Sequence, residues 1–119
     1  MNLSKSVVWA NQLSVSQSAN SYSSLTFNAT YAGYVSIYVE SGEIWVFTDV
    51  PILIEVYAYV RVIYSAYGVH YDNQVNVGTA GTAVFPVLPC SNIEIRIGNI
   101  NTNLYGLDAS ERVTIVYHY

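Results

Sequence analysis

The chain has 119 residues, a length typical of one domain, and 52% of them are hydrophobic, which excludes an intrinsically disordered chain. Only 10% are charged, against about 25% in an ordinary soluble domain, and the formal net charge is −4. With four lysines and arginines in all, the sequence lacks the basic patch that nucleic acid or an anionic membrane requires, so we expect neither partner.

The N-terminal segment predicts a strand followed by a connector. Residues 7–15 are suited to a strand, and the serine-rich stretch from Ser16 to Ser24 is typical of a flexible connector. An apolar strand on a soft tether can pair inside its own domain or inside a neighbour's. Residues 1–24 are therefore a candidate exchanged segment, whose apolar residues are Val7, Val8, Leu13 and Val15.

Polar and apolar residues alternate through the middle of the chain, as in strands with one buried face. This pattern covers residues 24–31 and 34–40, and residues 44–47 then predict a short buried run. The stretch from Ile52 to Tyr64 is rich in β-branched and aromatic residues on both faces, and it predicts the longest, central strand.

The second half of the chain continues the same pattern. Tyr67 and Gly68 predict a turn between two strands, and Pro86 predicts an edge strand because proline cannot donate to a ladder. Further strands are expected at residues 93–97 and 112–119. The eight to nine short strands predict a single all-β domain over residues 1–119, an antiparallel, jelly-roll-like β-sandwich.

Candidate catalytic and metal-binding groups are sparse. His70 and Asp72 lie two residues apart, and they would need a third group to bind a cation, so we expect a surface pair instead. Glu55 with Arg61, and Glu94 with Arg96, share strand faces and predict cross-strand ion pairs. No nucleophile motif or phosphate loop is present. We expect no enzyme activity, no metal and no cofactor.

Aromatic residues carry the functional hypotheses. The chain has 12 tyrosines, and four of them fall on the polar sides of predicted strands: Tyr34, Tyr38, Tyr57 and Tyr59. A tyrosine offers a flat apolar ring with a polar tip, which suits stacking on a sugar and also contact with another subunit. The two interpretations remain open at this point.

The low number of charged residues favours association, because surface charge usually keeps a protein soluble and monomeric. The sequence therefore predicts a non-enzymatic structural subunit of a virion, or of an extracellular fibre or surface assembly, that forms homo-oligomers. The alternative is a carbohydrate-binding module. No apolar run is long enough to insert into a membrane, and no signal peptide is visible, which leaves open whether a leader is absent or was removed. The expected location of the subunit is the virion or the extracellular space, and a virion fits best without a leader, because a virion protein reaches the outside without secretion.

Overall fold

The computed structural model describes residues 5–119, and over this range the regular elements are ten β-strands without a helix. The strands are β1 (Ser6–Gln17), β2 (Tyr22–Ala29), β3 (Gly33–Ser41), β4 (Ile44–Val46), β5 (Ile52–Ile54), β6 (Ala58–Ala66), β7 (Val69–Gly78), β8 (Ala80–Val87), β9 (Cys90–Asn99) and β10 (Ala109–His118). In this part of the chain, nothing forms a helix of the length and hydropathy that crossing a membrane requires.

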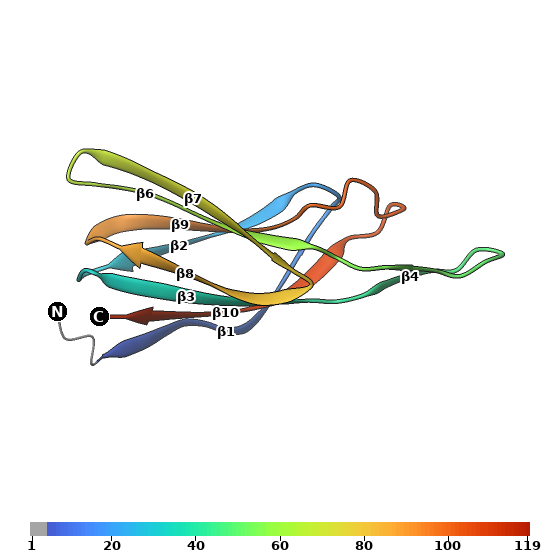
Figure 1. The fold of residues 1–119 in the computed structure, drawn as a ribbon, viewed down its shortest axis with the longest axis horizontal. Coiled ribbons are helices and arrows are strands. Elements are labelled where there is room, and N and C mark those ends of the chain that lie inside the picture. The colour runs from blue at the N-terminus through green and yellow to red at the C-terminus, as the bar shows by residue number, and fades with distance from the viewer. Residues whose placement is uncertain (1–4) are drawn as a thin grey trace.

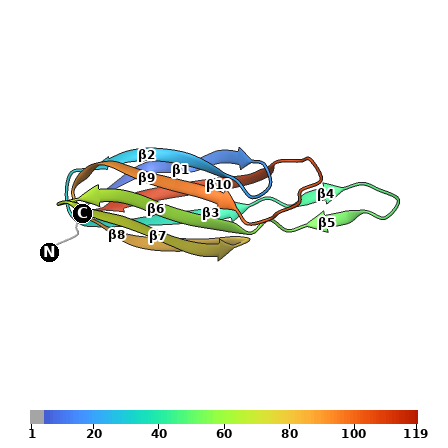
Figure 2. The ribbon, with the colours of Figure 1, turned by 90° about the horizontal axis from the view of Figure 1, so that it is seen from above.

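Eight of the strands form two antiparallel sheets of four. Sheet I has the order β1-β10-β3-β8, and sheet II has the order β2-β9-β6-β7. Seen from above, the strands of sheet II lie over those of sheet I, and the remaining hairpin, β4–β5, projects from one end (Figures 1 and 2). The first strand pairs with the last, and apart from the β6–β7 hairpin the successive strands of the two sheets alternate between them, which is the jelly-roll arrangement. The predicted jelly-roll-like sandwich is confirmed, with ten strands instead of eight or nine.

The core between the sheets comes from the apolar half of each alternating pattern. On β3, Val35, Ile37 and Val39 are fully buried, while the residues between them face outward. The inward residues of β10 lie beside them in the same sheet, and those of β6 and β9 meet them across the sandwich. These residues are Val60, Val62, Ile93, Ile95, Ile97, Val113 and Ile115.

The predicted continuous strand from Ile52 to Tyr64 is wrong, because β5 pairs with β4 in a separate sheet and the chain joins sheet II only at β6. At this break the Asn101 side chain replaces a neighbouring strand as the hydrogen-bond partner of the backbone. Its Oδ1 accepts from Tyr57 N at 3.0 Å, and its Nδ2 donates to Glu55 O at 3.0 Å. The alternation nevertheless continues, since Val56 packs with Leu104 in a second small core. Residues 52–64 contribute first to the small core and then to the main core, so their alternation resembles that of a single strand.

The prediction that residues 44–47 form a buried run is wrong, because two of the four side chains are exposed. Trp45 is 49% exposed and Phe47 is 81% exposed. The base of the β4–β5 hairpin packs on the small core of Val56, Leu104 and Ala109 through Ile44 and Ile54. A two-stranded hairpin has no second sheet to cover its tip.

The predicted flexible connector is mostly strand. β1 extends to Gln17 and β2 begins at Tyr22, so only residues 18–21 link them. This link is tied down: Asn20 N donates to Asn101 O at 2.7 Å, and Asn99 Nδ2 donates to Ser18 O at 2.8 Å.

The candidate exchanged residues lie on β1, which pairs with β10 of the same chain. Their register partners on β10 are Tyr117 for Val7, Val116 for Val8, Val113 for Leu13 and Glu111 for Val15. Residues 1–4 of the candidate segment lie outside the described range.

Two local predictions are confirmed. Tyr67 and Gly68 both have positive φ, 53° and 74°, and they form the two-residue turn between β6 and β7. Pro86 lies on β8, which is an edge strand of sheet I.

Candidate functional site

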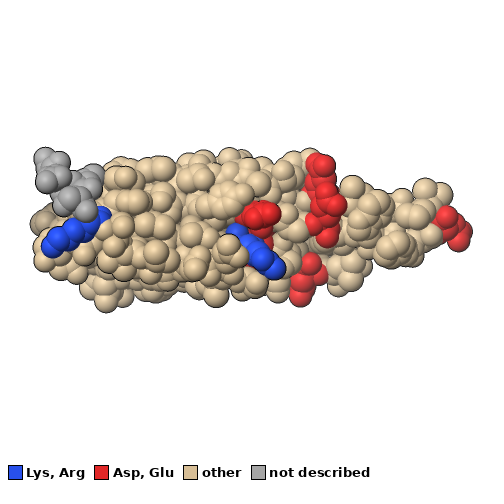
Figure 3. Space-filling view, turned by 90° about the horizontal axis from the view of Figure 1, so that it is seen from below, with Lys and Arg blue, Asp and Glu red and all other residues tan. Residues whose placement is uncertain are grey.

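The outer face of sheet I is almost free of charge. Cross-strand register places Val8, Val116, Ser36 and Val84 in one row across all four strands. Val8 and Val84 are each 58% exposed, at the two edges of the row. The next row holds Thr114, Tyr38 and Thr82. Figure 3 looks onto this face and shows a broad uncharged surface between a cation at one end and the charged cluster near the middle of the molecule.

Aromatic stacking stiffens the end of this face near the chain termini. The rings of Tyr34 and His118 are stacked with centroids 4.4 Å apart, and His118 Nε2 is hydrogen bonded to Ser36 Oγ at 3.2 Å. Both rings are half-buried. The uncharged surface is therefore preorganised as well as flat, which lowers the entropic cost of covering it.

The charges of this side gather toward the hairpin. Arg112 and Glu40 are register partners on β10 and β3, at the end of the face nearest β4. Six of the eight carboxyl groups belong to the hairpin end of the molecule, where acidic residues also dominate in Figure 3. They are Glu40, Glu43, Asp49, Glu55, Asp108 and Glu111.

The four tyrosines singled out from the sequence do not form one platform. Tyr34 and Tyr38 lie on the outer face of sheet I, whereas Tyr59 lies on β6 in sheet II. Tyr57 lies between β5 and β6, where its hydroxyl donates to Glu55 Oε2 at 2.9 Å. Alternation shows that a side chain points outward, but it does not show which sheet carries it.

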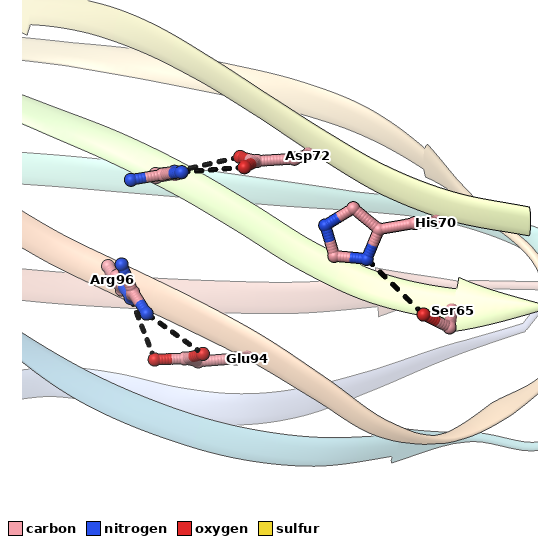
Figure 4. Close-up of polar contacts among 6 residues, drawn as sticks. Ser65, His70, Asp72, Glu94 and Arg96 are labelled. Carbon is pink, nitrogen blue, oxygen red and sulfur yellow. Dashed lines mark hydrogen bonds and ion pairs between the residues drawn. The ribbon is translucent and has the colours of Figure 1, made fainter.

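The outer face of sheet II is polar and internally neutral. Arg61 on β6 forms a bidentate pair with Asp72 on β7 at 2.7 and 2.6 Å, as shown in Figure 4. Arg96 Nε donates to Glu94 Oε2 at 2.8 Å. Arg61 therefore forms the predicted cross-strand ion pair, with Asp72 as its partner, whereas Glu94 and Arg96 pair along one strand instead of across two.

These ion pairs shift the pKa values of their carboxyl groups. The hydrogen bond from Arg61 holds the pKa of Asp72 below its usual value. The hydrogen bond from Arg96, helped by that of Ser24, likewise lowers the pKa of Glu94. Because Arg61 and Arg96 are register partners, each carboxylate also relieves the repulsion between two neighbouring guanidinium groups.

A glycine lets an aromatic ring lie flat on this face. Gly98 is the register partner of both Tyr22 and Tyr59, and a Cβ at this position would overlap the Tyr59 ring. Arg96 lies over the Tyr22 ring, 4.5 Å from its centroid. Tyr22, Arg96 and Tyr59 thus form a stacking surface around Gly98.

We expect Gly98→Ala to lower the free energy of unfolding by about 1–3 kcal/mol, because the new methyl group displaces the Tyr59 ring. Gly42→Ala is the matched control, since its Cβ would meet only Ser110 O, at 3.4 Å. Urea unfolding of both variants measures the difference. Equal costs for the two substitutions would contradict the close approach at Gly98.

A groove of about 510 Å³ crosses sheet II next to the ion pairs. Its polar lining comes from all four strands: Thr26 on β2, Ser65 on β6, His70 on β7, and Ser91, Asn92 and Glu94 on β9. Ser65 Oγ and His70 Nδ1 are 3.3 Å apart, as seen in Figure 4. Sequence reasoning missed this groove, because short polar residues on strands resemble an ordinary solvated face.

His70 and Asp72 do not share a partner. Asp72 is engaged by Arg61, and His70 by Ser65. Over residues 5–119 no three histidine, cysteine or carboxylate side chains come together in a way that could hold a metal ion.

The β4–β5 hairpin exposes large apolar side chains at its tip. Phe47 is 81% and Val50 is 72% exposed, and the Trp45 ring stacks on Phe47 at 6.4 Å. Exposed apolar residues gathered in this way indicate a contact surface.

No protein family matches this chain, and no curated protein sequence is significantly similar to it.

Proposed function

We propose that this protein is a non-enzymatic structural subunit of a virion, or of an extracellular fibre or surface assembly, in which copies associate through the uncharged outer face of sheet I. The supporting observation is the row Val8–Val116–Ser36–Val84, which spans the sheet with apolar groups at both edges. Burying such a surface gains hydrophobic free energy and leaves no unpaired charge in the interface.

Charge placement favours a second copy as the partner. The ion pairs of sheet II are internally neutral, so the negative charge of the chain resides at the hairpin end. Two copies packed face to face in antiparallel fashion place these acidic ends far apart. A symmetric pair of this kind joins the same patch on both subunits.

The hairpin tip provides the second surface that such an assembly would cover. It projects along the long axis of the molecule, away from the face of sheet I (Figure 1). Contacts through two separate surfaces extend an assembly beyond a closed pair, as a fibre or shell requires. The proposed location, in the virion or outside the cell, follows from this role.

Introducing lysine at Val8 and Val84 should disrupt self-association, because antiparallel packing brings like charges into an apolar contact. We expect the dissociation constant to rise by at least about tenfold, measured by sizing with light scattering over a concentration series. Val69→Lys, at an exposed valine of sheet II, is the matched control. A monomeric wild-type protein at all concentrations, or equal effects of the three substitutions, would refute the proposed interface.

A further inference from the structure

The groove of sheet II has the dimensions of a ligand site. Its volume of about 510 Å³ lies within the range of roughly 300–1,000 Å³ that is typical of small-molecule pockets. It lies on the sheet that the proposed self-association leaves uncovered. The strands that form it are paired on a jelly-roll scaffold, so the backbone beneath it is held in place without a ligand.

The lining offers hydrogen-bonding groups that the protein itself does not use. Within residues 5–119, the side chains of Thr26, Ser91 and Asn92 make no hydrogen bond to the protein. Together they supply hydroxyl groups that donate and accept, and an amide that does both. Such a set suits a ligand that carries many hydroxyl groups.

The groove also has an apolar element. Ile63 contributes to its lining, between Glu94 on one neighbouring strand and Asp72 on the other. Farther along the same face lie the rings of Tyr22 and Tyr59 around Gly98. A sugar presents hydroxyl groups at its rim and C–H groups on its faces, so an aliphatic side chain and stacked rings can contact successive units.

The charge of the groove selects against anions. Among residues 5–119, no lysine or arginine lines it, and Glu94 is the one carboxylate in the lining. Both oxygens of Glu94 are already engaged, by Arg96 and by Ser24. A phosphate, a sulfate or an acidic sugar would meet a carboxylate without a free cation to bind.

We propose that this groove binds a neutral glycan, with one sugar against Ile63 among the side chains of Thr26, Ser91 and Asn92 and the chain continuing toward Tyr22 and Tyr59. The site differs from the four-tyrosine platform considered from the sequence, because three of those tyrosines lie elsewhere. It is independent of the proposed self-association, which uses the opposite sheet.

Nuclear magnetic resonance titration of the full chain tests the proposal. The neutral probes are maltotriose, mannotriose and N-acetyllactosamine, at millimolar concentration, and sialyllactose is the acidic probe. We expect saturable shifts with at least one neutral probe, confined to amides of β2, β6, β7 and β9. No shift with any neutral probe, shifts on sheet I, or stronger binding of sialyllactose would overturn it.

Substitutions identify the site. Asn92→Ala and Thr26→Ala should each weaken binding by at least about fivefold, the effect of losing one hydrogen bond. Asn11→Ala on β1 and Thr102→Ala in the loop after β9 remove the same side chains from exposed positions outside the groove and should leave binding unchanged. Equal affinity for all four variants would place the ligand outside the groove. Sizing the same samples separates this result from the association test.

Discussion

Replacing Glu111 with glutamine should remove most of the loss of stability that the wild-type protein shows as the pH rises from 4.5 to about 7. Above this range the variant should be the more stable protein, by up to about 3 kcal/mol. The reason is the position of Glu111, which is only 1% exposed in the jelly roll.

The buried carboxyl group has one partner and lacks another. Gln17 Nε2 donates to Glu111 Oε1 at 2.9 Å, and also to Ile97 O at 3.3 Å. Over the described residues, Glu111 Oε2 and Gln17 Oε1 have no hydrogen-bond partner. A proton on Glu111 removes the cost of burying its charge and supplies the donor that this pair of side chains lacks.

The direction of the pH effect follows from the pKa of this group. Burial raises the pKa of Glu111 from 4.5 to about 7, although the hydrogen bond from Gln17 acts in the opposite direction. Between these values the folded protein binds more protons than the unfolded chain, so stability falls as the pH rises. The contribution is fully present below pH 4.5 and is lost through pH 7.

Urea unfolding across this pH range measures the effect in the wild type and in Glu111→Gln. Glu40→Gln changes an exposed carboxyl group at the same end of the protein and should keep the wild-type slope. Both variants should still lose stability in stronger acid, where Asp72 and Glu94 lose their ion pairs. Parallel curves for the wild type and Glu111→Gln would show that this carboxyl group is not the cause.

The sequence predicted the sandwich because period-two alternation is a local property. Val35, Ile37 and Val39 alternate with polar residues, and they are buried as expected. The break between β5 and β6 could not be predicted in this way, because it depends on Asn101, more than 40 residues away in the chain. Ile52 and Ile54 alternate equally well in a hairpin and in a central strand.

The candidate surfaces were predictable only in part. The scarcity of charged residues predicted that a sheet face associates with another molecule. The register that aligns Val8 with Val116 and Val84 could not be predicted, because it is set by pairings between strands far apart in the chain. The groove of sheet II joins Thr26 to Asn92 through the pairing of β2 with β9. Neither residue is distinctive alone, so no local signal could have identified them.

The two tryptophans should differ widely in their contribution to stability. The Trp9 ring on β1 stacks on Phe27 of β2 at 4.7 Å and on Tyr117 of β10 at 4.8 Å, so it connects the two sheets. Trp45 on the projecting hairpin has only Phe47 as a stacking partner in the described chain, at 6.4 Å. The same substitution at both positions therefore compares a bridging ring with an exposed one.

We expect Trp9→Ala to lower the free energy of unfolding by about 3 kcal/mol, since the cavity it leaves opens the end of the sandwich beside the chain termini. Tyr117 should lose support as well, and its hydroxyl accepts from Tyr31 N at 2.8 Å, so the effect should extend to the link between β2 and β3. Trp45→Ala should cost less than about 1 kcal/mol. Urea unfolding followed by circular dichroism gives both values, and hydrogen exchange should show faster opening of β1 in Trp9→Ala alone. A larger cost at Trp45 than at Trp9 would mean that the hairpin, rather than the contact between sheets, stabilises this fold.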